Sequence, residues 1–301
     1  MPFQFSENVW NTLACPHCSG PVEQTKTGAF CPTCDTGYGY TETGALDLRL
    51  KEHKKYVLEF MLNEPLLPES GFNFRPLSPN PKPEVDFSSL GVPHHLTKEL
   101  MSYIPKAKGR ESLILDLGCG SAVHRELCEH AGFEYVGLDY DTEQAPILGD
   151  AHSLPFRDES FESILSISVL EHIRYPFVMM REAYRVLKPN GSFIGTVAFL
   201  EPFHGDSFYH NTHLGVYNSL QFAGFRIVRV SPNKKWPGLV AQARQALFPK
   251  MPKIFAKSIV LPVLALHRLW WWAGRLITGR DTEDMRVRNT TGSFAFVATK
   301  D

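Results

Sequence analysis

The fold is decided by the stretch 112-SLILDLGCGSAVHRELCEHAGFEYVGLDYDTEQAPILGDAHSLPF-156. An apolar run, Leu113–Leu117, ends in a turn with two glycines; a helical segment follows, and a second short strand ends at Asp139. This order is typical of a nucleotide-binding βαβ unit. Glycine lets the turn approach a ligand closely because no Cβ intervenes. Since an acid after the second strand can accept hydrogen bonds from a ribose diol, the stretch predicts a site for an adenosine-containing cofactor.

Around this unit, strand-like apolar runs alternate with helical segments. The further strands are predicted over 161–168, 192–198, 225–230 and 293–299. Strands that alternate with helices favour an α/β fold with a mostly parallel, doubly wound sheet.

Five sequence motifs follow one another along the chain. They are LDLGCG (115–120), VGLD (136–139), GDAHSLPF (149–156), SFESILSISVLEHI (160–173) and REAYRVLKPNGSFIGTV (181–197). Through them the chain resembles class I S-adenosylmethionine-dependent methyltransferases, over about residues 95–230 and a final strand near 292–300. The resemblance implies a seven-stranded, Rossmann-like sheet and S-adenosylmethionine (SAM) as the cofactor.

The same resemblance implies which residues bind the cofactor. An acid and two glycines of the first motif shape the pocket for its methionine half, and the acid after the second strand binds the ribose hydroxyls. The third motif holds the adenine amino group, and a serine after the fourth strand lies near the reacting methyl. Along the chain these residues are Asp116, Gly118, Gly120, Asp139, Asp150, Ala151 and Ser168. The alternative role for each acid is a helix cap or a solvated turn residue.

One feature departs from the family pattern. Methyltransferases of this class have a full helix between the acid after the second strand and the acid of the third motif. Here only residues 140–149 separate Asp139 from Asp150, which is too short for a helix and a strand. We therefore expect that flank of the adenine pocket to be open, or covered by the proline-rich linker or the C-terminal region.

Four cysteines form two C-x-x-C pairs near the N-terminus: Cys15 and Cys18, then Cys31 and Cys34. Four thiolates at this spacing can complete a tetrahedral zinc shell, which stabilises a module too small for its own core. Such pairs also indicate a reducing compartment rather than disulfides. The segment resembles the zinc ribbons of several bacterial methyltransferases, including the rRNA guanine methyltransferases. An iron site or a metal-free remnant is the alternative to structural zinc.

The chain divides into a zinc ribbon (1–50), a linker or lid (51–95) and a methyltransferase domain (96–301). Apolar residues within 51–62 have the spacing of one helix face, which predicts a helix there. Six prolines between positions 65 and 83 indicate an extended linker or a lid over the site.

Methyl transfer to a hydroxyl requires a base, and two segments supply one. Proton removal near neutral pH suits a histidine or a carboxylate. Glu171-His172 follows the strand over 161–168, and the loop after the strand over 192–198 is rich in histidine. We predict His204 as the base, oriented by Asp206, with His172 as a second candidate. Structural hydrogen bonding, helix packing and a second metal site are the alternatives.

A long insert, 231–291, lies between the last two strands. Its residues 258–274, SIVLPVLALHRLWWWAG, are largely apolar and have lysines and arginines on both sides. Pro262, His267 and Arg268 interrupt this stretch, which is shorter than a spanning helix. We predict a helix packed on the domain or at a homodimer contact. The alternative is peripheral membrane contact at the inner membrane surface, which would suit a lipid-linked acceptor.

The bulk composition narrows the function. The chain has 301 residues and a formal net charge of −1, which argues against DNA and RNA as partners. Its first ten residues lack the basic and apolar regions of a secretory signal, so we expect a cytoplasmic protein. The prediction is a SAM-dependent methyltransferase acting on a hydroxyl of a small molecule, a sugar, or a glycan or lipid-linked intermediate. An RNA base methyltransferase, suggested by the ribbon, and a non-catalytic scaffold are the alternatives.

Overall fold

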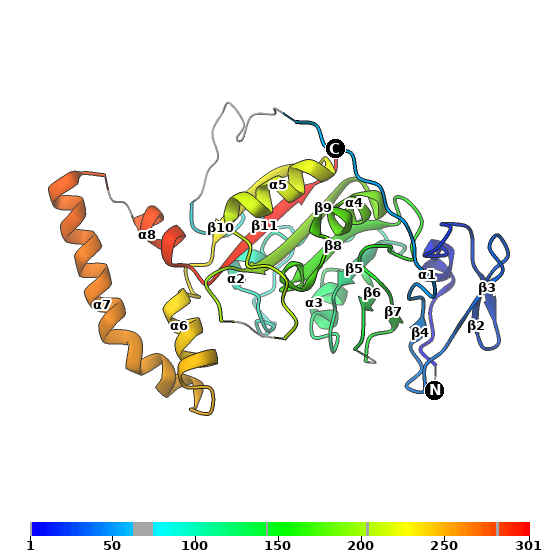
Figure 1. Cartoon of the computed structure of the whole chain (residues 1–301), viewed down its shortest axis with the longest axis horizontal. Coiled ribbons are helices and arrows are strands. Elements are labelled where there is room, and N and C mark those ends of the chain that lie inside the picture. The colour runs from blue at the N-terminus through cyan, green and yellow to red at the C-terminus, as the bar shows by residue number, and fades with distance from the viewer. Residues whose placement is uncertain (1, 63–74, 143, 203–204, 281–282) are drawn as a thin grey trace.

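The computed structural model describes residues 2–62, 75–142, 144–202, 205–280 and 283–301. Within them, eight strands build one central sheet (Figure 1). These strands are β4 (Leu46–Asp47), β5 (Leu113–Leu117), β6 (Glu134–Asp139), β7 (Ile147–Leu148), β8 (Phe161–Ile167), β9 (Leu187–Ala198), β10 (Arg226–Pro232) and β11 (Ser293–Thr299).

The sheet has the order β10-β11-β9-β8-β5-β6-β7-β4. All pairs from β4 to β9 are parallel, whereas β11 is antiparallel to both β9 and β10. Seven of the strands confirm the predicted doubly wound, mostly parallel sheet. The eighth, β4, comes from the N-terminal segment and extends the edge beside β7. Because the strand order reverses beside β5, the carboxyl ends of β5 and β8 flank the crevice in which such sheets bind ligands.

Helices cover both faces of the sheet. These helices are α2 (Lys98–Met101), α3 (Arg125–His130), α4 (Pro176–Val186) and α5 (His213–Ala223). Every residue of β5 is buried, and successive side chains point to opposite faces. Leu115 packs in one hydrophobic cluster with α4 and α5, and Ile114 packs in another with α2 and α3. This two-sided burial explains why β5 is an unbroken apolar run.

The N-terminal segment joins the same core. It contains α1 (Glu7–Thr12) and a three-stranded antiparallel sheet of β1 (Glu23–Thr25), β2 (Gly28–Cys31) and β3 (Thr36–Gly39). Leu13, Tyr38 and Leu46 are buried in the cluster that also holds β5, α4 and α5. The ribbon and the central sheet therefore share one hydrophobic core.

The helix predicted over 51–62 is wrong, because this segment is extended. Lys54 Nζ donates a hydrogen bond of 2.7 Å to the backbone oxygen of Pro16 in the ribbon. The ring of Phe60 stacks on Phe222 of α5, with centroids 4.6 Å apart, and meets Phe177 of α4 edge-on. An extended chain rises about 3.3 Å per residue and a helix only about 1.5 Å. Anchors on separate elements thus favour extended backbone over a helix.

The insert protrudes from the domain instead of packing on it (Figure 1). It consists of α6 (Gly238–Gln242), the π-helical turn η2 (Ala243–Leu247), α7 (Lys253–Thr278) and α8 (Glu283–Thr290). The helix α7 runs for 26 residues straight through Pro262, and only Ala256 and Val260 of α7 are buried. The prediction of a helix packed on the domain is therefore wrong, whereas a homodimer contact stays a prediction. By length and composition alone, α7 could cross a membrane.

Candidate functional site

The turn after β5 has the geometry of a ligand-binding glycine loop. Gly118 and Gly120 have φ values of +78° and +50°, a region that favours glycine. A Cβ on Gly118 would lie 2.4 Å from Val169 Cγ2, whereas a Cβ on Gly120 would meet no described heavy atom within 4 Å. The first glycine is thus required for packing, and the second leaves the backbone open to a ligand.

Asp116 is fully buried beside this turn. Its Oδ2 accepts a hydrogen bond of 2.8 Å from the Tyr135 hydroxyl and lies 3.2 Å from His124 Nδ1. Its Oδ1 is buried and has no hydrogen-bond partner among the residues described. A buried carboxylate oxygen without a donor is costly. The ammonium group of SAM could supply that donor, so the residues present fit the methionine half of this cofactor.

His124 lies in none of the five sequence motifs. Its Nε2 lies 3.4 Å from the backbone oxygen of His94, so both ring nitrogens face acceptors. Burial lowers the pKa of His124, but its hydrogen bond and charge interaction with Asp116 outweigh that effect and raise the pKa overall. The geometry favours a buried imidazolium–carboxylate pair under the glycine turn. No sequence pattern indicates this pair, because only the packing of α3 on β5 brings its members together.

Asp139, at the end of β6, lies against the same turn. Its Oδ2 accepts a hydrogen bond of 2.8 Å from the backbone N–H of Gly120. Its Oδ1 accepts one of 3.3 Å from the N–H of Thr142. The predicted ribose ligand and the glycine loop are therefore adjacent, as the βαβ pattern requires; that Asp139 binds ribose stays a prediction.

Asp150 lies close to Asp139, because the N–H of the preceding residue, Gly149, donates a hydrogen bond of 2.8 Å to the backbone oxygen of Asp139. Asp150 Oδ1 accepts hydrogen bonds from the N–H and Nδ1 of His152, at 2.8 and 2.6 Å. His152 Nε2 accepts one of 3.0 Å from the N–H of Tyr175. Burial raises the pKa of Asp150, but these bonds lower it overall. Oδ2 of Asp150, next to the buried Ala151, makes no hydrogen bond with the part of the chain that the structure describes, and its role in holding adenine stays a prediction.

Ser168 directly follows β8 and has an unusual backbone conformation, φ +58°. Its N–H donates to Thr196 on the neighbouring β9, at 3.1 Å to both the backbone oxygen and Oγ1. Non-glycine residues with positive φ cluster at functional sites, held there by the surrounding structure. Ser168 thus lies at the crevice beside β5, and its contact with the cofactor stays a prediction.

The helix expected to be missing is indeed absent from the described residues between Asp139 and Asp150. The N-terminal segment lies beside this short loop. Arg49, two residues after β4, donates a hydrogen bond of 3.3 Å to the backbone oxygen of Tyr140 and pairs with Asp47 at 2.6 Å. A cleft of about 450 Å³ lies between these three residues and β3.

The base candidates lie in two segments that meet. His204 falls outside the described residues, and Asp206 is exposed. His172, half-buried, ends the 3₁₀ turn η1 (Leu170–His172), and a Cβ on Gly205 would lie 3.6 Å from its Cε1. The N–H groups of 208 and 209 donate to the backbone oxygen of Glu171 at 2.7 and 3.1 Å. The loop after β9 therefore packs on η1 beside the crevice.

Comparison with known proteins agrees with this arrangement. Residues 115–195 match the Methyltransf_11 family, described as a methyltransferase domain. Two uncharacterised methyltransferases, from Mycobacterium marinum and Mycobacterium leprae, are each 29% identical over 116 and 117 residues. These matches support a class I SAM-dependent methyltransferase. They cover 34% of this chain and 46% and 44% of the two relatives, about half of their length.

Among solved structures, a SAM-dependent methyltransferase from Mesorhizobium loti aligns with 67% of this chain and 95% of its own, at 17% identity and a TM-score of 0.43.

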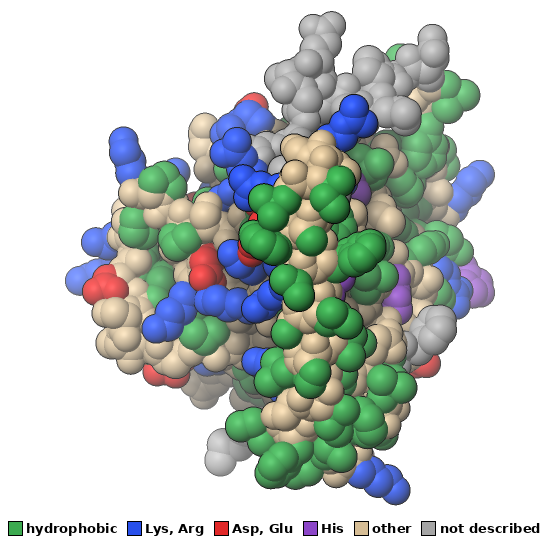
Figure 2. All heavy atoms as spheres, turned by 90° about the vertical axis from the view of Figure 1, so that its left-hand side faces the viewer, with side chains coloured by type: hydrophobic (Ala, Val, Ile, Leu, Met, Phe, Trp, Pro, Cys, Tyr) green, Lys and Arg blue, Asp and Glu red, His purple; other side chains and the backbone are tan. Residues whose placement is uncertain are grey.

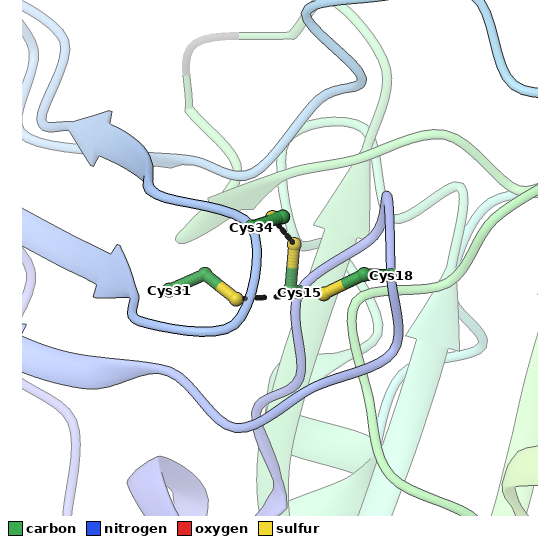
Figure 3. A group of neighbouring side chains, drawn as sticks. All are labelled: Cys15, Cys18, Cys31 and Cys34. Atoms are coloured by element: carbon green, nitrogen blue, oxygen red, sulfur yellow. Dashed lines mark hydrogen bonds between the residues drawn. The ribbon is translucent and has the colours of Figure 1, made fainter.

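The four ribbon cysteines lie outside the region matched to the methyltransferase family. Their sulfurs face one another from two loops and all lie within 4.8 Å of one another (Figure 3). Cys15 and Cys34 are 3.5 Å apart at sulfur, as are Cys18 and Cys31. Tetrahedral zinc with Zn–S bonds of about 2.3 Å needs sulfurs about 3.8 Å apart. The cluster is therefore compatible with one zinc ion.

Proposed function

We propose that the protein transfers a methyl group from SAM to a hydroxyl of a small molecule, a sugar, or a glycan or lipid-linked intermediate. The observation that carries this proposal is the buried, unpartnered Oδ1 of Asp116 beside an open glycine turn that is hydrogen-bonded to Asp139. A charged acceptor for the ammonium group, an open backbone and an acceptor for the ribose diol match, in that order, the methionine and ribose parts of SAM.

Each of these groups has a role in binding. Asp116 Oδ1 would accept a hydrogen bond from the ammonium group, with the neighbouring imidazolium of His124 limiting the charge buried there. Gly120 lets the backbone approach the ligand. Asp139 and Asp150 would accept hydrogen bonds from the ribose hydroxyls and the adenine amino group. When bound, SAM supplies an electrophilic methyl on a sulfonium whose sulfur departs as a neutral thioether.

The acceptor side needs orientation and a base. The loop after β9 and the turn η1 border the crevice, and both carry histidines. A base there would take the hydroxyl proton as the oxygen attacks in line with the leaving sulfur. The strand β8 is followed by Ser168-Val169-Leu170-Glu171, without the Asn/Asp-Pro-Pro-Tyr/Phe motif frequent in base-amine methylation. This favours a hydroxyl acceptor over a nucleic-acid base.

The cysteine cluster has a structural role in this proposal. Four thiolates complete a closed zinc shell, with no open position for a substrate. The pKa of Cys15 is raised by burial, but its hydrogen bond with the Tyr38 hydroxyl and backbone bonds lower it to about 7. Zinc would then hold together the two loops that pack on the central sheet.

Cofactor binding can be tested by titration calorimetry of the zinc-loaded protein with SAM and S-adenosylhomocysteine. We expect binding of one molecule per chain, and at least about ten-fold weaker binding in Asp116→Asn, which lacks the buried charge. The control is Glu111→Gln, an exposed acid at the opposite end of β5. If the wild-type protein binds neither compound, the scaffold alternative is favoured.

The acceptor class can be tested with methyl-labelled SAM and fractionated cell extract. We expect the label in the organic-soluble or the small-molecule fraction. It should be released by conditions that cleave O-methyl groups and leave N-methyl amines intact. Transfer to the RNA fraction would instead favour the RNA methyltransferase alternative, and its dependence on salt would separate specific from electrostatic binding.

A further inference from the structure

The helix α7 carries a continuous apolar face that the rest of the protein leaves uncovered. Figure 2 shows hydrophobic side chains gathered along the length of this helix. Trp270 and Ile277 are 76% and 85% exposed. The other large exposed apolar residues of α7 are Ile254, Phe255, Ile259, Leu261, Val263, Leu266, Leu269, Trp272 and Leu276. At about 100° per residue, the eleven together occupy an arc of about 200°.

The basic residues of α7 occupy a separate, narrow stripe. Lys253, Lys257, Arg268 and Arg275 are exposed and fall within an arc of about 60° on one flank of the apolar face. Residues 253–278 contain no Asp or Glu. The remaining side of the helix holds the buried Ala256 and Val260, which pack against α6 and η2. The helix thus has a protein side, a cationic edge and an apolar face.

We infer that α7 lies in the surface of an anionic lipid bilayer. A helix that lies in the interface buries its apolar face among the acyl chains and keeps basic side chains at the headgroups, which is the division seen here. Tryptophan is favoured at the same level because its ring is apolar and its N–H is polar. The occupant of the face is therefore a membrane of negative charge.

Two alternatives, a membrane-spanning α7 and a second copy of the chain packed on the apolar face, fit less well. The helix is about 39 Å long, enough to span a bilayer core of about 30 Å. A spanning α7 would, however, place Arg268 inside the hydrocarbon, which is costly. A second copy of the chain would bring an identical cationic edge toward the first, whereas anionic headgroups complement that edge.

The insert is joined to the loop that borders the proposed acceptor site. Trp236 Nε1 and Gln245 Nε2 donate to the two carboxylate oxygens of Glu201, at 2.7 and 3.2 Å. A Cβ on Gly238 would lie 2.7 Å from Leu200 Cβ. Membrane binding through α7 would thus hold this loop near the bilayer. That step rests on the proposed function and favours a lipid-linked acceptor, whereas membrane binding itself does not depend on it.

The test is flotation of the zinc-loaded 301-residue chain with vesicles of phosphatidylcholine alone or mixed with phosphatidylglycerol. We expect binding that rises with the anionic lipid and falls with salt. Arg268→Gln and Arg275→Gln should each weaken it about five-fold, and the control Lys26→Gln, in the ribbon, should not. Trp270→Ser should weaken it more than Val57→Ser, since Val57 is an apolar residue of the linker with a similar exposure of 68%.

Three outcomes would overturn the inference. The first is no flotation with anionic vesicles. The second is stronger binding by Arg268→Leu, which would indicate a spanning helix instead. The third is a dimer, detected by light scattering, that Trp270→Ser dissociates while vesicles bind neither form; the apolar face would then be an interface between two copies.

Discussion

The hydroxyl of Ser153 donates a hydrogen bond of 2.5 Å to the backbone oxygen of Pro16, which joins the GDAHSLPF segment to the first cysteine pair. Lys54 Nζ binds both atoms, at 2.9 and 2.7 Å. The N–H of Ala14 also donates to the backbone oxygen of Pro155 at 3.0 Å. The segment proposed to hold adenine therefore rests on the loop that carries Cys15 and Cys18.

Loss of the metal should for this reason weaken cofactor binding. We expect the wild-type protein to hold about one zinc ion per chain and Cys31→Ser to lose most of it. The Kd for SAM should then rise about ten-fold, because one or two loop hydrogen bonds of about 1 kcal/mol each are lost. Zinc is measured by elemental analysis and SAM binding by calorimetry. The control is Cys128→Ala, a buried cysteine of α3 outside the cluster.

Because the ribbon and the sheet share one core, the same variant should unfold in a single transition at a lower temperature. A separate low-temperature transition of the ribbon, with unchanged SAM binding, would show that the two parts are independent.

The two glycines of the turn should respond differently to alanine. In Gly118→Ala the new residue has to adopt a positive φ and its Cβ also clashes with Val169. We therefore expect a loss of about 2–3 kcal/mol in the free energy of unfolding. Gly120→Ala meets only the backbone penalty, about 1 kcal/mol. Its methyl group enters the space proposed for the ligand, so SAM binding should fall at least ten-fold in a folded protein.

Urea unfolding and calorimetry separate these two effects. Gly109→Ala serves as the control, because its Cβ meets no described atom within 4 Å and its φ is not positive. Normal SAM affinity in Gly120→Ala would remove the cofactor from this side of the turn.

The candidate bases can be ranked by turnover. We expect His204→Ala or His172→Ala to lower methyl transfer about 10²-fold, the usual contribution of a general base, with SAM binding unchanged. Asp206→Asn should have a smaller effect if it only orients the base. His130→Ala, exposed on α3, is the control. Near wild-type turnover in both histidine variants would rule out the assigned roles, and the base would have to come from elsewhere.

Much of the fold could be predicted from the chain, because it depends on local patterns. The run Leu113–Leu117 is buried on both faces, as its unbroken apolar sequence predicts. The two-residue strand β4 is too short to have a pattern, and only pairing with β7 defines it. The segment 51–62 has helical spacing, but contacts at its two ends, invisible in the sequence, hold it extended.

Contacts between residues that are far apart in the chain could not be predicted from the sequence. Pro262 suggests a helix break, yet α7 continues, since the ring removes only one hydrogen bond from a 26-residue helix. His124 has no motif around it, and its partner Asp116 is recognised only because that acid belongs to the glycine-loop motif. Such contacts depend on how α3 packs on β5, which no local pattern describes.

The pair of His124 and Asp116 predicts how stability depends on pH. The pKa of His124 is raised above its ordinary value of 6.5 in the folded protein. Between the two values the folded state holds a proton that the unfolded state releases, so stability falls as pH rises. The contribution is fully present below the unfolded pKa and lost above the folded one. We expect the free energy of unfolding of wild type minus that of His124→Gln to decline as the pH rises above about 6.5 and through the raised folded-state pKa of His124. Urea unfolding at several pH values measures this difference, and subtraction cancels the other histidines. A constant difference would mean that folding does not shift the pKa of His124.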